Sequence, residues 1–269
     1  MDKATFAGIA VGFGGITAGL LLEGGKLSQV LQPTAALIVA GGTLGAILLQ
    51  FPLSTVFRAV RELRCVIREP RSPGAEEIGL LVKLAHKARR EGIISLDNEL
   101  ASIPSAFMRR AIMLAVDGTE SSELRAIMQR ELDATAEAEE ELPRVYESAG
   151  GFAPTIGIIG AVLGLIQVMQ HLDKIEEVGR GIAVAFVATI YGVGFANLIA
   201  LPVAGKLRHR LRLRQILREL TLEGVIAILE GTNPRMLETK LNGFLQQETE
   251  KANTTGTAAA AAESARGVR

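Results

Sequence analysis

Four long apolar runs, arranged in two pairs, constrain the fold of this chain more than any other feature of its sequence. A helix needs about 20 mostly apolar residues to cross the hydrocarbon core of a bilayer. We expect membrane spans at residues 5–22, 33–52, 152–172 and 181–203. The pattern predicts an all-α integral membrane protein with four transmembrane helices and a helical cytoplasmic domain between the second and the third.

The placement of charge predicts the orientation of these spans. The formal net charge is zero, but arginines and lysines gather just after the second and fourth runs. These basic residues are Arg58, Arg61, Arg64, Arg68, Lys206, Arg208, Arg210, Arg212 and Arg214. By the positive-inside rule, both termini and the central segment lie in the cytoplasm.

This topology divides the chain into five segments. They are a first transmembrane hairpin (1–52), a cytoplasmic helical domain (53–151), a second transmembrane hairpin that lines an ion path (152–203), cytoplasmic C-terminal helices (204–250) and a disordered tail (251–269). Within the central segment we expect a helix from Pro73 to about Gly92 and another from Ser121 to about Ala149, with Pro143 as a kink.

Signatures of enzyme chemistry are missing from the sequence. There is no P-loop, no H-E-x-x-H and no G-x-S-x-G. The histidines His86, His171 and His209 lie far apart, and Cys65 is the single cysteine, so a metal cluster is not expected. We therefore expect no catalytic residue, no metal, no cofactor and no nucleic-acid partner.

The third and fourth runs carry the residues of greatest functional interest. Pro154 lacks a backbone donor, so it can bend a helix, although proline in a first helical turn is also ordinary. Ala161 follows on nearly the same face, and Thr189 begins a small-residue stripe in the fourth run. That stripe is either a close helix–helix contact or a pore face with a hydroxyl. Intramembrane ion paths normally use a carboxylate, and the interiors of these runs have none, so a partner must bring the acid.

Charged residues surround Gly92 in the central segment. Arg89, Arg90 and Glu91 precede it, and Asp97 and Glu99 follow it. The stretch is either a solvated surface or a docking face for a charged partner, which salt should weaken.

Several stretches together resemble the MotA/PomA family, the channel-forming stator subunits of the bacterial flagellar motor. The resemblance covers about residues 1–245. It rests on Leu22-Glu23-Gly24-Gly25, Val39-Ala40-Gly41-Gly42-Thr43, Ala88-Arg89-Arg90-Glu91-Gly92-Ile93-Ile94-Ser95-Leu96-Asp97, Ala153-Pro154-Thr155-Ile156-Gly157, Ala188-Thr189-Ile190-Tyr191-Gly192 and Pro202.

The resemblance implies a mechanism and a set of partners. A homo-oligomeric ring, expected to be a pentamer, would surround a peptidoglycan-anchored MotB/PomB-type partner in the bacterial inner membrane and act on a FliG-type rotor protein. The implied ion-path residues are Pro154, Thr155, Ala161, Thr189 and Pro202. The implied rotor-contact residues are Arg89, Arg90, Asp97 and Glu99. Asp97 stands where the family usually has glutamate, so Glu99 is an alternative for that role.

The same resemblance bears on the coupling ion and on the nearest alternative functions. Ala161 and Ala188 leave few hydroxyls to replace a sodium hydration shell, so we expect H⁺ to be the transported ion. The overall likeness to PomA-like and MotP-like sequences favours Na⁺ instead. Two further alternatives are an energiser subunit of the ExbB/TolQ type, which usually has three spans, and a membrane scaffold that conducts no ion.

Overall fold

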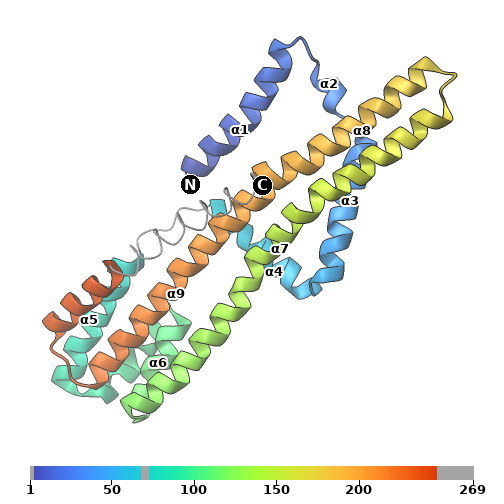
Figure 1. Ribbon diagram of the computed structural model, residues 1–269. Coiled ribbons are helices and arrows are strands. Elements are labelled where there is room, and N and C mark those ends of the chain that lie inside the picture. Colours follow the sequence, from blue (N-terminus) through green and yellow to red (C-terminus); the bar gives the residue numbers. More distant parts are fainter. Residues whose placement is uncertain (1–2, 68–72, 247–269) are drawn as a thin grey trace. The chain divides into compact units, whose positions relative to one another are not determined.

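The computed structural model describes residues 3–67 and 73–246, and the regular elements of these residues are helical (Figure 1). The predicted tail, 251–269, lies outside the described residues. The elements are α1 (Lys3–Leu22), α2 (Leu27–Val30), α3 (Pro33–Gln50), α4 (Leu53–Ile67), α5 (Pro73–Glu91), the 3₁₀-helix η1 (Ile93–Ser102), α6 (Ala106–Val116), α7 (Ser121–Gln170), α8 (Ile175–Phe195), the π-helix η2 (Ala196–Ala200), α9 (Leu201–Leu229) and a last helix, residues 234–246.

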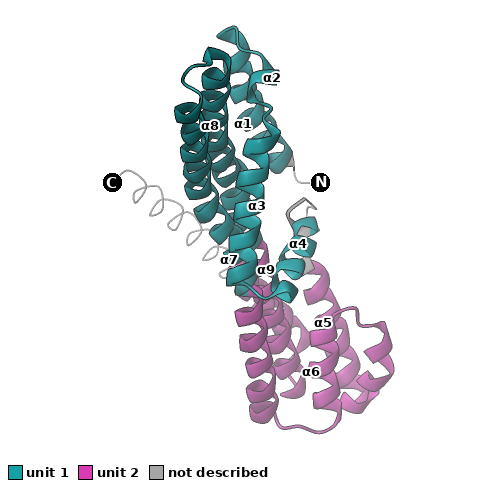
Figure 2. Ribbon diagram, turned by 90° about the vertical axis from the view of Figure 1, so that its right-hand side faces the viewer, with its two compact units in different colours: residues 1–69, 140–208 teal, residues 70–139, 209–269 magenta. Residues whose placement is uncertain are grey.

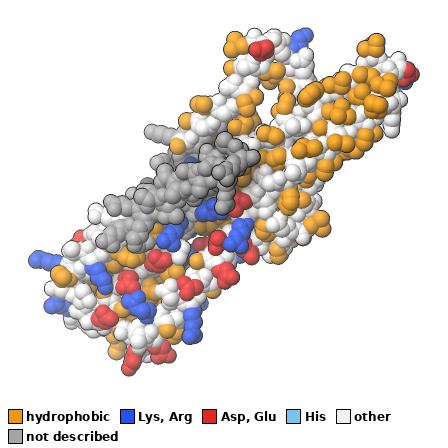
Figure 3. Space-filling model, viewed as in Figure 1, with side chains coloured by type: hydrophobic (Ala, Val, Ile, Leu, Met, Phe, Trp, Pro, Cys, Tyr) orange, Lys and Arg blue, Asp and Glu red, His pale blue; other side chains and the backbone are white. Residues whose placement is uncertain are grey.

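Four of these helical stretches are long and apolar enough to cross a membrane. They are α1, α3, a part of α7 and a part of the helix that begins with α8. On the face drawn in Figure 3, hydrophobic side chains gather over the hairpin of α7 and α8. An apolar surface of this kind is stable in lipid, whereas soluble proteins rarely expose so much of it. The predicted all-α class with four apolar helices is confirmed.

The third predicted span is part of a much longer helix. α7 begins at Ser121 and continues to Gln170 with both Pro143 and Pro154 inside it. The expected end near Ala149 was wrong, and Pro143 does not end the helix. Pro154 is therefore an interior proline, which excludes the ordinary first-turn placement that the sequence had left open.

The chain forms two compact units, each built from two separate stretches of sequence (Figure 2). Unit 1 comprises residues 1–69 and 140–208, and unit 2 comprises residues 70–139 and 209–269. Unit 1 thus contains both predicted membrane hairpins. The division differs from the five expected segments because α7 and α9 each contribute to both units without interruption.

Unit 2 has a conventional apolar core. Its fully buried side chains come from α5, η1, α6, the first part of α7, the later part of α9 and the last helix, residues 234–246. The largest of them are Leu81, Leu96, Ile103, Met108, Ile112, Leu124, Met128, Leu132, Ile216, Leu220 and Leu222. At the rim of this core, Arg218 of α9 donates two hydrogen bonds of 2.8 Å to the carboxylate of Glu139 on α7. Such a bidentate pair fixes the register of the two helices.

One carboxyl group lies partly inside this unit. Glu77 of α5 is 2.8 Å from the hydroxyl of Thr221, which is fully buried and also lies 2.9 Å from the Leu217 carbonyl oxygen. Burial raises the pKa of Glu77, and the hydrogen bond that Thr221 donates to it offsets part of this.

We expect Glu77→Gln to stabilise unit 2 at neutral pH. When folding raises the pKa of a carboxyl group, the group stabilises the folded state at pH values below its pKa in the unfolded chain. This stabilisation is lost as the pH rises through the pKa of the folded state. The neutral amide removes this loss, so the gain should be about 1 kcal/mol or less at pH 7 and should shrink towards pH 4.5. Thermal unfolding followed by amide exchange in α5 measures it. Glu76→Gln, at the exposed neighbouring position, is the control, and an equal gain there would contradict the argument.

Candidate functional site: the hairpin of α7 and α8

Glycine and alanine bring the backbones of α7 and α8 into direct contact. A Cβ atom added at Gly157 of α7 would lie 2.8 Å from the carbonyl oxygen of Ala188, and one at Gly164 would lie 2.8 Å from that of Gly181. A Cβ at Gly192 of α8 would collide with the carbonyl oxygen of Ala153. Real Cβ atoms do not approach oxygen so closely, so any larger residue would force the helices apart. The hairpin depends on these glycines.

Pro154 and Thr189 lie on facing turns of this contact. Gly192 meets the Cα atom of Pro154, and Gly157 meets the Cα atom of Thr189. Both Pro154 and Thr189 are half-buried. The structure therefore brings together the two residues that the sequence had singled out from different spans.

The two threonine hydroxyls near this point are bonded within their own helices. Thr189 donates to the Ala185 carbonyl oxygen at 3.3 Å, and Thr155, which is exposed, donates to the Phe152 carbonyl oxygen at 2.8 Å. Each hydroxyl oxygen still has lone pairs, so either can accept a hydrogen bond from a water. In a single chain, the buried part of the stripe, Gly192 and Ala196, serves helix packing.

Pro202 follows a local widening of the helix that the sequence analysis missed. η2 is a π-helix, in which the amide of Leu201 donates to the carbonyl oxygen of Ala196. Proline has no amide hydrogen, so the carbonyl oxygen of Leu198 loses its usual donor, and a π-turn accommodates this. An interior proline after a long apolar run was the signal in the sequence. Pro202 itself is exposed.

Ala161 is the last of the predicted ion-path residues, and α3 of the first hairpin packs nearby. Ala161 is half-buried, two helical turns along α7 from Pro154. α3 packs on the α7–α8 hairpin, because Gly42 contacts Ile156 of α7 and Ile38 contacts Gly160. Along the hairpin, Ala161 lies on one side of the Pro154–Thr189 pair and Pro202 lies on the other.

The charged residues around Gly92 separate into paired and unpaired groups. Glu99 accepts a 2.6 Å salt bridge from Lys87, and this hydrogen bond lowers the pKa of Glu99. Arg89 and Asp97 are exposed and make no ion pair within residues 3–67 and 73–246. Gly92 has a φ of 84°, which favours glycine and sets the turn between the two helices. Asp97 is thus more available to a partner than Glu99.

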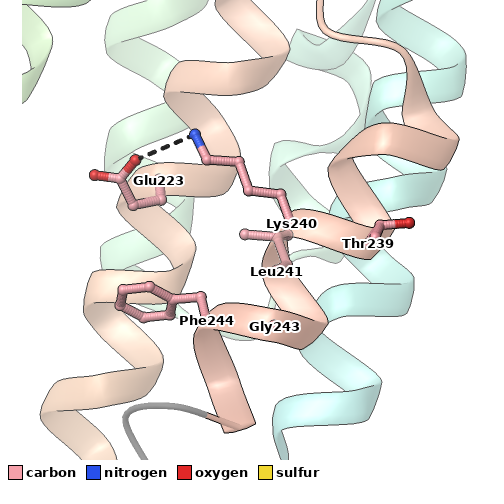
Figure 4. A pocket seen from close by; sticks show the side chains of 6 residues that line it. All are labelled: Glu223, Thr239, Lys240, Leu241, Gly243 and Phe244. Carbon is pink, nitrogen blue, oxygen red and sulfur yellow. Dashed lines mark ion pairs between the residues drawn. The ribbon is translucent and has the colours of Figure 1, made fainter.

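A hollow of about 330 Å³ in unit 2 offers no comparable chemistry (Figure 4). Its two charged residues, Lys240 and Glu223, lie 3.8 Å apart, and Arg125, which is not part of the lining, contacts both Glu223 oxygens at 2.5 and 3.2 Å. Because the charges are already satisfied, this hollow lacks a group that would select a ligand.

Comparison with known proteins agrees with this architecture. Residues 6–92 match the family described as Motility protein A N-terminal, and residues 99–220 match the MotA/TolQ/ExbB proton channel family. Motility protein A of Bacillus subtilis is 34% identical over 246 residues, which cover 91% of each chain.

Two solved structures show the same fold. The structure of C. jejuni MotAB has a TM-score of 0.85 at 31% identity and covers 91% of this chain and 96% of its own. The flagellar MotAB stator complex from Bacillus subtilis has a TM-score of 0.80 at 34% identity, with 89% and 94% covered.

The fold and the glycine-packed hairpin define a helical membrane subunit, with two hairpins of span-length apolar helices in one compact unit and a helical core in the other. The chain belongs to the MotA/TolQ/ExbB proton channel family, in its motility protein A branch.

Proposed function

We propose that this chain is the stator subunit of a flagellar motor that conducts ions together with a MotB/PomB-type partner and turns ion flow into torque. The observation that carries the proposal is the Pro154–Thr189 pair on the glycine-packed hairpin, with no carboxylate inside either predicted span. The solved relatives are MotAB complexes, which supports a partner of that type. Such a partner supplies the acidic group that the hairpin lacks.

The match to the N-terminal family supports a stator over an energiser of the ExbB/TolQ type. This match covers α1 to α5 and therefore includes both helices of the first hairpin. Proteins of the ExbB/TolQ type usually have three spans and lack such a first pair. We further propose a pentameric ring in the bacterial inner membrane, with both termini and unit 2 in the cytoplasm and a FliG-type protein as the rotor. The basic residues that follow the second and fourth spans support this orientation.

We propose protons as the coupling ion. The side chain of Ala188 is fully buried and Ala161 carries no oxygen, so the hairpin offers few ligands for sodium near Thr189. The test is rotation of tethered cells in a stator-deleted host that expresses this chain with its cognate partner in sodium-free medium. Rotation is the expected result. Paralysis that sodium relieves would identify a sodium motor, and paralysis in both media with an assembled complex would favour the energiser or scaffold alternatives.

Arg89→Glu should remove most of the torque while the complex still assembles. Arg89 is exposed and makes no ion pair in the described part of the chain, so its reversal leaves the fold unchanged but opposes an acidic rotor surface. Swimming speed and the amount of complex in the membrane measure the two effects. A charge reversal on the rotor should restore part of the speed. Arg130→Glu, another exposed arginine, is the control, and equal loss there would make the effect non-specific.

A further inference from the structure

The helix α4 follows directly on the second predicted span. α3 ends at Gln50, and α4 begins at Leu53 in the same compact unit (Figure 2). Between them, Phe51 has an extended backbone and Pro52 lacks the amide hydrogen that would continue α3, so the chain turns there. Because so short a connection cannot carry the chain far, the start of α4 lies where α3 meets the bilayer surface.

One face of α4 packs against the rest of unit 1. Thr55 and Ala59, one helical turn apart, are both buried. The hydroxyl of Tyr146 on α7 donates a hydrogen bond of 2.9 Å to the carbonyl oxygen of Ala59. Glu62, the one carboxylate in the sequence of α4, lies two turns from Thr55 on this face and is half-buried. These contacts fix the rotation of α4 about its axis, and so decide which side chains point away from the protein.

The adjacent face of α4 exposes a row of three large apolar side chains. Leu53, Phe57 and Val60 follow one another at i, i+4 and i+7, so they form one stripe along the helix. Their exposed fractions are 61%, 68% and 55%. Proteins rarely leave such a row in water. Because α4 starts where a span ends, the boundary between lipid headgroups and acyl chains is within reach of the stripe and can remove it from water.

Three arginines lie beside the apolar stripe. Arg58, Arg61 and Arg64 are exposed and recur every three residues, so they are neighbours on the helix surface. None of the three makes an ion pair within residues 3–67 and 73–246. Since Glu62 lies on the packed face, the outward surface of α4 carries positive charge without a carboxylate. A basic amphipathic helix with this pattern is typical of the membrane interface, where its cations attract anionic lipids.

We propose that α4 binds anionic phospholipids, with Leu53, Phe57 and Val60 among the upper acyl-chain carbons and a lipid phosphate held between Arg58 and Arg61. Side chains three residues apart on a helix can reach one phosphate together, and each guanidinium group offers it paired donors. Anionic lipids are preferred over zwitterionic ones, because the ammonium group of a choline headgroup opposes the arginines. The site requires neither ion flow nor a rotor, so it is independent of the proposed role as a stator.

A tryptophan on the stripe reports which lipid touches α4. The chain contains no tryptophan, so Val60→Trp adds a single reporter to it at an exposed position. The purified complex with its partner is placed in phosphatidylcholine nanodiscs, in which phosphatidylglycerol or phosphatidylcholine with brominated acyl chains replaces part of the lipid. Bromine quenches a tryptophan that it contacts, and the signal of the complex without Val60→Trp is subtracted. We expect both lipids to quench, with the anionic lipid bound about fivefold more tightly.

Two pairs of substitutions in the Val60→Trp chain test the arginines. Arg58→Gln with Arg61→Gln should make the two lipids bind about equally, while quenching by phosphatidylcholine remains. Arg130→Gln with Arg235→Gln removes the same charge from exposed positions of unit 2 and should leave the preference unchanged.

Three results would overturn the proposal. Equal quenching by the two lipids before the arginines are changed would exclude a preference for anionic lipid. A preference that survives Arg58→Gln with Arg61→Gln would exclude these two residues as its source. Quenching by neither lipid would show that protein, such as a second copy of this chain, covers the stripe.

Discussion

Gly192→Ala should prevent the stable accumulation of this subunit in the membrane. The added methyl group would collide with the carbonyl oxygen of Ala153 and would lie 3.1 Å from the Cα atom of Pro154. Both obstacles are backbone atoms, so no side-chain rotation relieves the contact. Overpacking usually costs 1–3 kcal/mol, and we expect a cost of roughly 3 kcal/mol here because two helices must separate.

A matched substitution on the same helix separates this effect from a general intolerance of bulk. A Cβ at Gly194 would meet nothing within 4 Å, so Gly194→Ala should accumulate normally. The measurement is the amount of each variant in purified membranes and the fraction that co-purifies with the partner. Normal accumulation of Gly192→Ala would show that the α7–α8 contact is looser than the structure indicates.

Pro154→Ala should assemble fully but abolish rotation. Pro154 lies inside α7 and has no amide hydrogen, so the carbonyl oxygen of Gly150 lacks its normal donor and the helix can bend there. Alanine supplies the donor. Removing an interior proline stabilises a helix by up to about 3 kcal/mol, so a loss of rotation in this variant would not come from misfolding.

Rotation of tethered cells, together with co-purification of the partner, tests this role. Pro143→Ala provides the comparison, because Pro143 is also inside α7 but precedes the predicted span. We expect that variant to rotate. Normal rotation of Pro154→Ala would leave Pro154 as a structural residue only, and a loss of assembly would place its effect in folding.

The sequence predicted the membrane architecture because hydrophobicity alone requires it. The starts of the first two spans at Thr5 and Pro33 agree with α1 and α3, since a run of apolar residues of spanning length has one stable environment. Helices were also expected after the fourth span, and α9 there runs from Leu201 to Leu229. The end of the helix at Ala149 was wrong, because Gly150 and Gly151 are tolerated in a helix that packs closely on Leu201.

The individual site residues remain predictions, and the structure refines them unequally. It places Pro154 and Thr189 on facing turns, and it leaves Arg89 and Asp97 exposed while Glu99 pairs with Lys87. Sequence reasoning did not find the π-turn before Pro202. That turn depends on which backbone carbonyl loses its donor and on how the helix adjusts, which requires coordinates.

By itself, the sequence determined that this chain is a helical membrane protein without a carboxylate inside its spans, because composition and the cost of burying charge in lipid decide both. Only the tertiary structure decided which glycines are indispensable. Gly192 and Gly194 look alike in the sequence, but one faces the backbone of Ala153 and the other faces open space. The difference is one of distance between helices, and such distances are set by packing rather than by the order of residues.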